Sequence, residues 1–253
     1  MIVPDAFRAP LKGGRPLKRW RYVGVFGEEL MACFGSVRIG PLAQSFWAVL
    51  DADGLRERTR FLPGAVALRN GAVRVRGVCD LVVEPAGEAI ELVSPHGAQS
   101  IWTRKTPARV RGTIGAQDID LPALVDDSAG YHARVTEWEW AAGAGIDAQG
   151  RDIRWNLVTG VHDALTGSER RVWVDGVARE LGPVTFSDEL DAVRFDDGAE
   201  LRFAARAERA RHDELVLFAS DYRQPFASAS GTLPGGIELV SGAGVLERHR
   251  ARW

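Results

Sequence analysis

The chain has 253 residues, of which 45% are hydrophobic and 26% charged, a composition typical of a globular protein with a sizeable core. Its 32 lysines and arginines nearly balance 34 aspartates and glutamates, and the resulting net charge of -2 argues against a nucleic-acid partner. The N-terminus lacks the basic and apolar regions of a secretory signal, and no apolar run approaches the ~18 residues of a membrane span. These features predict a cytoplasmic protein.

Turn signals recur along the chain in order. The pairs Asp53-Gly54, Asn70-Gly71, Asp175-Gly176 and Asp197-Gly198 each lie between apolar runs. A type I′ hairpin needs positive φ at both central residues, which Asn-Gly and Asp-Gly tolerate best, so each pair predicts a hairpin. With two further turn segments, at 85–88 and 147–150, the pattern indicates about twelve strands.

Apolar and polar residues alternate at 73–76, 136–140 and 153–157, which is typical of half-buried antiparallel strands. Helical periodicity is confined to two short segments, 121–126 and 207–212, so helix is a minor component. The two cysteines, Cys33 and Cys79, lie in apolar strand-like runs and are predicted to be reduced core thiols, because two cysteines are too few for a disulfide framework.

The strand spacing predicts an all-β, antiparallel fold, built as a sandwich or as barrels rather than from βαβ units. A less regular segment around 109–130 interrupts the strand pattern, and we place a domain boundary there. The prediction is an N-terminal β-barrel-like half at 1–115 and a C-terminal one at 116–253, packed side by side. One large sandwich is the alternative.

Several segments together resemble the bacterial family catalogued as domain of unknown function 2804 (DUF2804), over about residue 20 to Trp253. They are Tyr22-Val23-Gly24-Val25-Phe26, Gln44-Ser45-Phe46-Trp47, Ser94-Pro95-His96-Gly97, Ile101-Trp102-Thr103-Arg104-Lys105, Asp126-Asp127-Ser128-Ala129-Gly130-Tyr131-His132, Trp155-Asn156-Leu157-Val158-Thr159-Gly160 and Ser230-Gly231-Thr232-Leu233-Pro234-Gly235-Gly236. The resemblance implies no activity. More distantly, the family is similar to lipocalin-like proteins that include carotenoid 1,2-hydratase and tocopherol cyclase. That likeness implies a two-barrel architecture for an apolar ligand, and no catalytic residue is carried over from it.

The densest group of polar residues lies at 126–132, where carboxylates, a hydroxyl, a phenol and an imidazole follow one another. A buried carboxyl beside another carboxylate has a raised pKa and can donate a proton near neutral pH, as hydration or cyclisation of an alkene requires. We therefore predict Asp127 as proton donor, with Asp126 and His132 tuning it. The alternative is an ordinary turn or helix cap, in which the same oxygens accept local N–H groups.

Aromatic residues near this segment suit the wall of an apolar cavity. Tyr131, Trp138 and Trp140 are predicted to contact a ligand, and Asn156 and His96 are predicted to line the same space. For each tryptophan, simple core packing is the alternative. No spacing matches a metal-ligand signature, and no nucleophile elbow, phosphate loop or dinucleotide motif occurs, so neither a metal nor a cofactor is predicted.

These observations favour a protein that binds an apolar isoprenoid or lipid-like molecule in a β-barrel cavity and transforms it by acid/base proton transfer, through hydration, isomerisation or cyclisation. A lipocalin-like carrier with no catalytic activity would use the same cavity. A carbohydrate-active protein is the third possibility, although the adjacent residues Asp126 and Asp127 point in different directions along a strand. The sequence predicts no oligomeric state.

Overall fold

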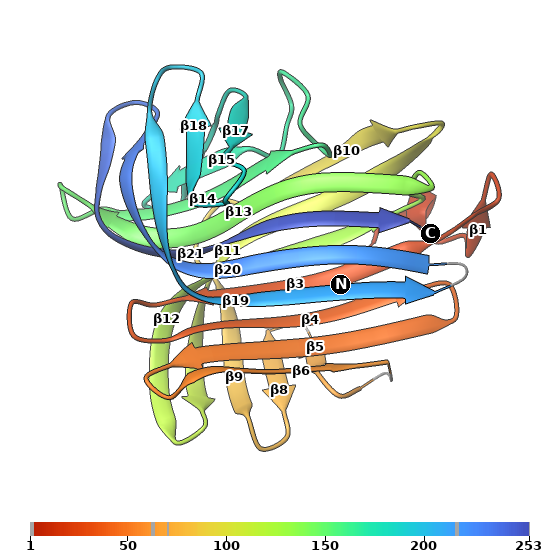
Figure 1. Ribbon diagram of the computed structural model, residues 1–253, viewed down its shortest axis with the longest axis horizontal. Coiled ribbons are helices and arrows are strands. Elements are labelled where there is room, and N and C mark those ends of the chain that lie inside the picture. The colour runs from red at the N-terminus through yellow and green to blue at the C-terminus, as the bar shows by residue number, and fades with distance from the viewer. Residues whose placement is uncertain (1–2, 62–63, 70, 216–217, 253) are drawn as a thin grey trace.

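The chain forms an antiparallel all-β structure, which confirms the predicted fold class. The computed structural model describes residues 3–61, 64–69, 71–215 and 218–252, and within them the only helical element is the 3-10 turn η1 (Asp5–Phe7). A small sheet of β1 (Leu11–Lys12) and β2 (Arg15–Pro16) follows this turn. Two large curved sheets, which form the two lipocalin-like halves, then lie side by side (Figure 1).

The first sheet has the strand order β6-β5-β4-β3-β12-β11-β9-β8-β7, and β10 pairs with the N-terminal part of β11. Its strands are β3 (Lys18–Phe26), β4 (Met31–Ile39), β5 (Leu42–Asp51), β6 (Gly54–Arg60), β7 (Ala67–Arg69), β8 (Ala72–Val75), β9 (Cys79–Pro85), β10 (Ile90–His96), β11 (Gln99–Ile114) and β12 (Gln117–Gly130).

The second sheet has the strand order β16-β15-β14-β13-β21-β20-β19-β18-β17. Its strands are β13 (Val135–Asp147), β14 (Asp152–Thr159), β15 (Arg171–Val174), β16 (Val177–Glu180), β17 (Val184–Phe186), β18 (Ala192–Phe195), β19 (Glu200–Leu215), β20 (Phe218–Leu233) and β21 (Ile237–Arg252).

The two sheets repeat one topology. In each, the first long strand starts a meander of four strands, and the last long strand returns to pair with the first, as β12 does with β3 and β21 does with β13. The chain changes sheet in the short connection 131–134. The boundary between the two sheets therefore lies at that connection. Whether the ranges 1–115 and 116–253 fold as independent domains stays a prediction.

The expectation of a less regular segment around 109–130 is wrong. Strands β11 and β12 pair continuously from Ile101 opposite Gly130 to Ile114 opposite Gln117, and only a tight turn separates them. The helical candidates 121–126 and 207–212 are also wrong, because they lie within β12 and β19. In both cases a long two-stranded ladder satisfies the backbone polar groups, and this tertiary pairing overrides the weak local periodicity.

The predicted turns agree with the structure better than the predicted helical segments do. Asp175 and Gly176 have φ values of 49° and 80°, and they join β15 to β16 in the two-residue hairpin that the pair predicts. The pairs at 53–54 and 197–198 also lie between paired strands. Asn70, in the fourth pair, lies outside the described residues.

Both faces of the central strands are buried, because each half has its own core and a third core lies between the halves. Strand β4 shows the division: Ala32 and Phe34 face the core of the first half, whereas Met31 and Cys33 face the core between the sheets. Strands buried on both faces read as continuous apolar runs rather than as alternation. The cysteines are free and buried, as predicted.

Close packing at Gly143 yields a stability prediction. This glycine is the cross-strand partner of Trp155, and a Cβ at Gly143 would lie 2.1 Å from the Trp155 ring and 2.5 Å from the carbonyl oxygen of Ala243. We expect Gly143→Ala to lower the free energy of unfolding by about 1–3 kcal/mol in urea titrations, because the core is overpacked. Adding Trp155→Leu should cost less than the sum of the single changes. Strictly additive losses would contradict this explanation.

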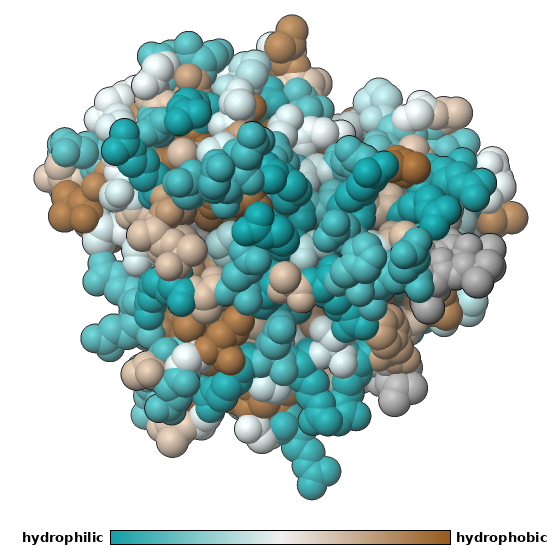
Figure 2. All heavy atoms as spheres, in the orientation of Figure 1, coloured by the Kyte–Doolittle hydropathy of each residue, from teal (hydrophilic) through white to brown (hydrophobic). Residues whose placement is uncertain are grey.

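The outer surface in the view of Figure 2 is mainly hydrophilic, with small separate apolar patches. Exposed large apolar residues are dispersed along the chain, from Leu11 and Leu42 to Leu165 and Val240. Scattered single residues of this kind are normal for a protein surface. The described part of the chain contains no helix with the length and apolar character needed to cross a membrane.

Candidate functional site

A cavity of about 490 Å³ lies between the two sheets. Its wall contains side chains of β3, β5 and β11 from the first sheet and of β13, β20 and β21 from the second. This volume lies in the range of small-molecule sites. The sequence predicts a β-barrel cavity. Packing of the halves instead places this space between them, because the long strands β3, β12, β13 and β21 face one another across the third core.

Three charged side chains meet in the wall of this cavity. Lys105 Nζ lies 2.8 Å from Asp126 Oδ1 and 3.3 Å from Glu169 Oε2, and all three residues are buried, with exposed fractions of 3%, 8% and 2%. Lys105 and Asp126 are direct cross-strand partners on β11 and β12, whereas Glu169 comes from the loop before β15. The cluster therefore joins the two halves of the molecule.

A hydrogen-bonded chain holds this cluster in place from the second half. Trp140 Nε1 donates to Asn156 Oδ1 at 2.8 Å, and Asn156 Nδ2 donates to the backbone carbonyl of Glu169 at 2.9 Å. Lys105 Nζ lies 5.9 Å from the centroid of the Trp140 ring. Trp140 lines the cavity, whereas Asn156, which was predicted to line it, lies fully buried behind the wall and positions its neighbours.

The electrostatics of the cluster follow from two carboxyls sharing one ammonium. Burial raises the pKa of the Asp126 carboxyl above its ordinary value, the Lys105 ammonium opposes this shift, and the Glu169 carboxylate adds to it. Although burial lowers the pKa of Lys105, its two carboxylate partners outweigh that effect and raise it. The arrangement favours a charged lysine beside a carboxyl that can retain a proton and release it.

His132 lies at another part of the wall, in the connection between the sheets. Neither of its ring nitrogens has a hydrogen-bond partner in the described structure, and its ring centroid lies 5.2 Å from that of Trp20 and 5.5 Å from that of His96. His96 is half-buried behind the wall, where its Nε2 lies 3.3 Å from Thr136 Oγ1. His132 and His96 therefore lie close together, but of the two only His132 lines the cavity, whereas both were predicted to belong to it.

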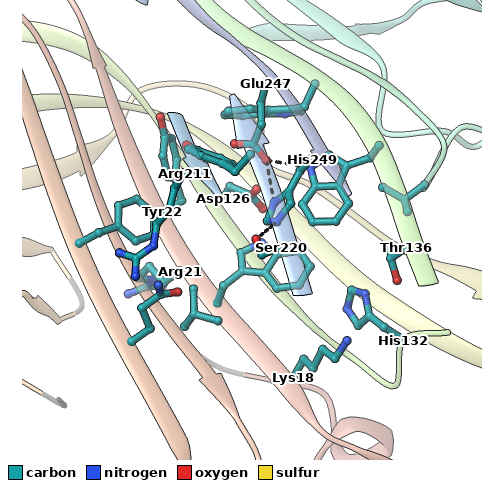
Figure 3. Close-up of a pocket in the computed structure, with 18 of the residues that line it drawn as sticks. Lys18, Arg21, Tyr22, Asp126, His132, Thr136, Arg211, Ser220, Glu247 and His249 are labelled. Atoms are coloured by element: carbon teal, nitrogen blue, oxygen red, sulfur yellow. Dashed lines mark hydrogen bonds and ion pairs between the residues drawn. The ribbon is translucent and has the colours of Figure 1, made fainter. Parts of the chain in front are cut away.

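Neutral bases gather at this end of the cavity. Burial lowers the pKa of His132 well below its ordinary value, and the Lys18 ammonium lowers it further. Burial also lowers the pKa of His162 to about 3, and the Nδ1 of this residue lies 2.8 Å from Ser94 Oγ. Figure 3 shows Lys18 and His132 at the same end. At neutral pH these imidazoles are uncharged, so each carries one ring nitrogen that can accept a hydrogen bond.

Lys18 gives a pH-dependent prediction. Burial, with a smaller effect of Arg15, lowers its pKa from 10.5 to about 6, so the folded state must release a proton that the unfolded state keeps. This penalty is absent above the unfolded pKa, grows as the pH falls, and is complete below the folded pKa. We expect Lys18→Met to stabilise the protein by on the order of 3 kcal/mol at pH 7, and by less at pH 9.

Urea unfolding at both pH values measures this effect, and Lys12→Met, at an exposed lysine of β1, is the matched control. A stability gain at Lys18 that does not change with pH would contradict the proposed cause.

A third polar group occupies the wall formed by the second sheet (Figure 3). Ser220 Oγ lies 2.8 Å from His249 Nε2, and His249 Nδ1 lies 3.7 Å from Glu247 Oε1. Trp138, which was predicted as a wall residue, lines the cavity here and donates its Nε1 to Glu247 Oε1 at 2.8 Å.

The structure separates two other candidates from this cavity. Asp127 lies on the opposite face of β12 from Asp126, where it accepts two hydrogen bonds of 2.7 Å from Arg21, and it lines a smaller cavity of about 310 Å³ against the core of the first half. Tyr131 is fully buried, and its hydroxyl donates to the carbonyl of Ala9 at 2.7 Å. The alternation of side chains along a strand places adjacent aspartates on opposite faces.

Five residues of the site are not among those predicted from the sequence, in which Glu169 is interpreted as part of a solvated strand end rather than as a charge paired in a cavity. Lys105 and Glu169 complete the charged cluster, and Ser220, Glu247 and His249 form the polar group on the second sheet. The only local signal is the spacing of Glu247 and His249, which places both on one face of a strand. Within the described ranges, there is no group of three or more histidine, cysteine, aspartate or glutamate side chains that could hold a metal ion.

The chain is similar in sequence to one protein family and in fold to several solved structures. Residues 67–253 match the family described as "Domain of unknown function (DUF2804)". The fold is similar to that of kievitone hydratase from Nectria haematococca, with a TM-score of 0.58 and 10% identity over 98% of this chain and 92% of that one. It is also similar to a candidate AttH from Nitrosomonas europaea, with a TM-score of 0.54 and 13% identity over 98% and 96%. No relative matches among curated proteins. Identities this low show a shared fold alone.

Proposed function

The chain belongs to the DUF2804 family, and we propose that it is an enzyme that binds an apolar small molecule between its two halves and transforms it by proton transfer. The observation that carries this proposal is the buried Asp126 carboxyl, which has a raised pKa and lies on the wall of the 490 Å³ cavity. A carboxyl with these properties is a suitable general acid near neutral pH. Asp126 therefore takes the donor role that the sequence analysis gave to Asp127.

The residues around the cavity suggest how the reaction proceeds. Asp126 donates its proton to an unsaturated carbon of the ligand, and the rings of Trp138 and Trp140 stabilise the positive charge that develops. His132, which is uncharged, accepts a proton from a water molecule that adds to the cation, and this completes a hydration. Loss of a proton without water addition gives isomerisation, and attack by a second double bond, followed by loss of a proton from the new cation, gives cyclisation.

The fold comparison supports the same class of reaction. Kievitone hydratase is named for a hydration, and it shares the two-half architecture at 10% identity. Only the reaction class is taken from this comparison. The substrate that we propose, an isoprenoid or lipid-like compound, comes from the sequence. The absence of a cofactor, a cytoplasmic location, a bacterial origin and the lack of a nucleic-acid partner stay predictions from the sequence.

Two other functions use parts of the same site. A carrier would bind and protect an apolar ligand in this cavity without any need for Asp126. A carbohydrate-active protein would expose its tryptophans along a groove, whereas Trp140 is buried, with an exposed fraction of 6%. The charged cluster favours the enzyme over both.

Native mass spectrometry of the protein purified from its own host, followed by extraction of bound compounds, tests the proposal. The extracted compound is returned to purified protein in water labelled with ¹⁸O, and the products are analysed by mass spectrometry. We expect an apolar compound to be bound and converted, with the label incorporated if the reaction is hydration. Recovery of the compound unchanged would identify a carrier, and failure of all apolar compounds to bind would overturn the proposal.

A further inference from the structure

The polar group on the second sheet has the composition of a nucleophilic site. Ser220 lies on β20, and Glu247 and His249 lie two residues apart on one face of β21. The serine oxygen is 2.8 Å from one nitrogen of the imidazole, and the other nitrogen is 3.7 Å from the carboxylate. A serine, a histidine and an acid in this order can activate a hydroxyl. All three residues line the cavity.

Neighbouring side chains fix both the imidazole and the carboxylate. The His249 ring lies between the rings of Trp138 and Tyr222, with centroid distances of 4.3 Å and 5.2 Å. Glu247 Oε1 accepts a hydrogen bond from Trp138 Nε1 at 2.8 Å, and its Oε2 accepts one from Gln224 Nε2 at 3.1 Å. A base whose orientation is set by a third group is the arrangement that nucleophilic sites require.

The hydrogen-bonding roles within the group are consistent with this function. When Ser220 donates its hydroxyl proton to His249 Nε2, the neutral imidazole carries its own proton on Nδ1, the nitrogen that faces Glu247. When the imidazole gains a second proton, the carboxylate stabilises the positive charge. The separation of 3.7 Å is longer than a hydrogen bond, as is common in sites without a bound substrate.

We propose that Ser220 is a nucleophile that, with His249 as its base and Glu247 as the orienting acid, cleaves an ester whose apolar part occupies the cavity. Ser220 Oγ forms a bond to the ester carbonyl carbon, and its proton passes to His249 Nε2. The bond from that carbon to the alkoxy oxygen then breaks, and the leaving alkoxide takes the proton from His249. Water, deprotonated by His249, attacks the acyl-enzyme, releases the acid and returns the proton to Ser220.

A long-chain alkyl fluorophosphonate tests the nucleophile directly, whatever the natural ester is. Attack by Ser220 on phosphorus expels fluoride, and the intact mass rises by one phosphonyl group. We expect one adduct per chain, mapped to Ser220 by tandem mass spectrometry. We also expect no adduct in Ser220→Ala, and labelling at least about 100-fold slower in His249→Gln, since a general base contributes that much or more.

Ser228→Ala is the matched control, because Ser228 is an exposed serine on the same strand and should leave the labelling rate unchanged. Circular dichroism verifies that each variant is folded. Peptide mapping of the wild-type adduct decides the question even if a variant fails to fold. The proposal is overturned if the wild type takes no adduct, if the adduct lies at another residue, or if folded His249→Gln is labelled at the wild-type rate. The readout does not depend on proton transfer by Asp126.

Discussion

Replacing Lys105 with methionine is expected to lower the free energy of unfolding by about 3–5 kcal/mol at pH 8, because removal of one partner leaves buried charge without compensation. Lys105 is the cation between Asp126 and Glu169, and all three side chains are almost fully buried. Without it, two carboxylates face each other in the protein interior. Urea unfolding followed by tryptophan fluorescence measures the loss.

The loss should depend on pH in a defined direction. A carboxyl whose pKa is higher in the folded state than in the unfolded state favours folding when it is protonated, and this contribution disappears as the pH rises through the folded value. The pKa of Asp126 is already raised, mainly by burial, and loss of the Lys105 ammonium raises it further. The deficit of Lys105→Met should therefore be smaller at pH 5 than at pH 8.

A variant with neutral side chains at all three positions is the control for this explanation. Adding Asp126→Asn and Glu169→Gln to Lys105→Met removes the uncompensated charges, so stability should recover by at least half of the loss. If Lys105→Met is as stable as the wild type, or if the triple variant is no more stable than the single one, the cluster does not carry the charge that we assign to it.

Replacing one of the two adjacent aspartates, Asp126 or Asp127, with asparagine is expected to have very different effects on kcat. We expect Asp126→Asn to reduce kcat for conversion of the bound compound about 100-fold or more, because an amide cannot donate the proton. Asp127→Asn should leave kcat within a few-fold of the wild type, because Asp127 faces Arg21 on the other side of β12. Steady-state kinetics, corrected for the folded fraction, separate the two.

Stability measurements complete this comparison. Asp127→Asn weakens a paired Arg21 contact, so it should reduce stability, whereas Asp126→Asn leaves Lys105 and Glu169 as a one-to-one pair. The assignment of the donor fails if Asp127→Asn abolishes turnover and Asp126→Asn does not. In that case the donor first predicted from the sequence would be correct, and the smaller cavity of the first half would be the site.

The local signals in the sequence were sufficient for the class of fold. Turn pairs such as Asp175-Gly176 define hairpins through the backbone conformations that they tolerate. Alternation at 153–157 marks a strand, but the predicted half-burial is wrong, because both faces of this strand are buried. The segment 109–130 was misread because Gly112 and Pro122 weaken its local strand signal, whereas continuous pairing between β11 and β12 sets its structure.

For the site, the sequence by itself predicted acid/base residues near aromatic ones, and the structure places Asp126, His132, Trp138 and Trp140 on the wall of one cavity. Only the tertiary structure decided which aspartate faces that cavity, because the face of a strand depends on which side its neighbours cover. The tertiary structure alone places Lys105 next to Glu169, which lies more than sixty positions further along the chain. The physical reason is that register and sheet packing, rather than sequence proximity, place side chains from separate strands at one point.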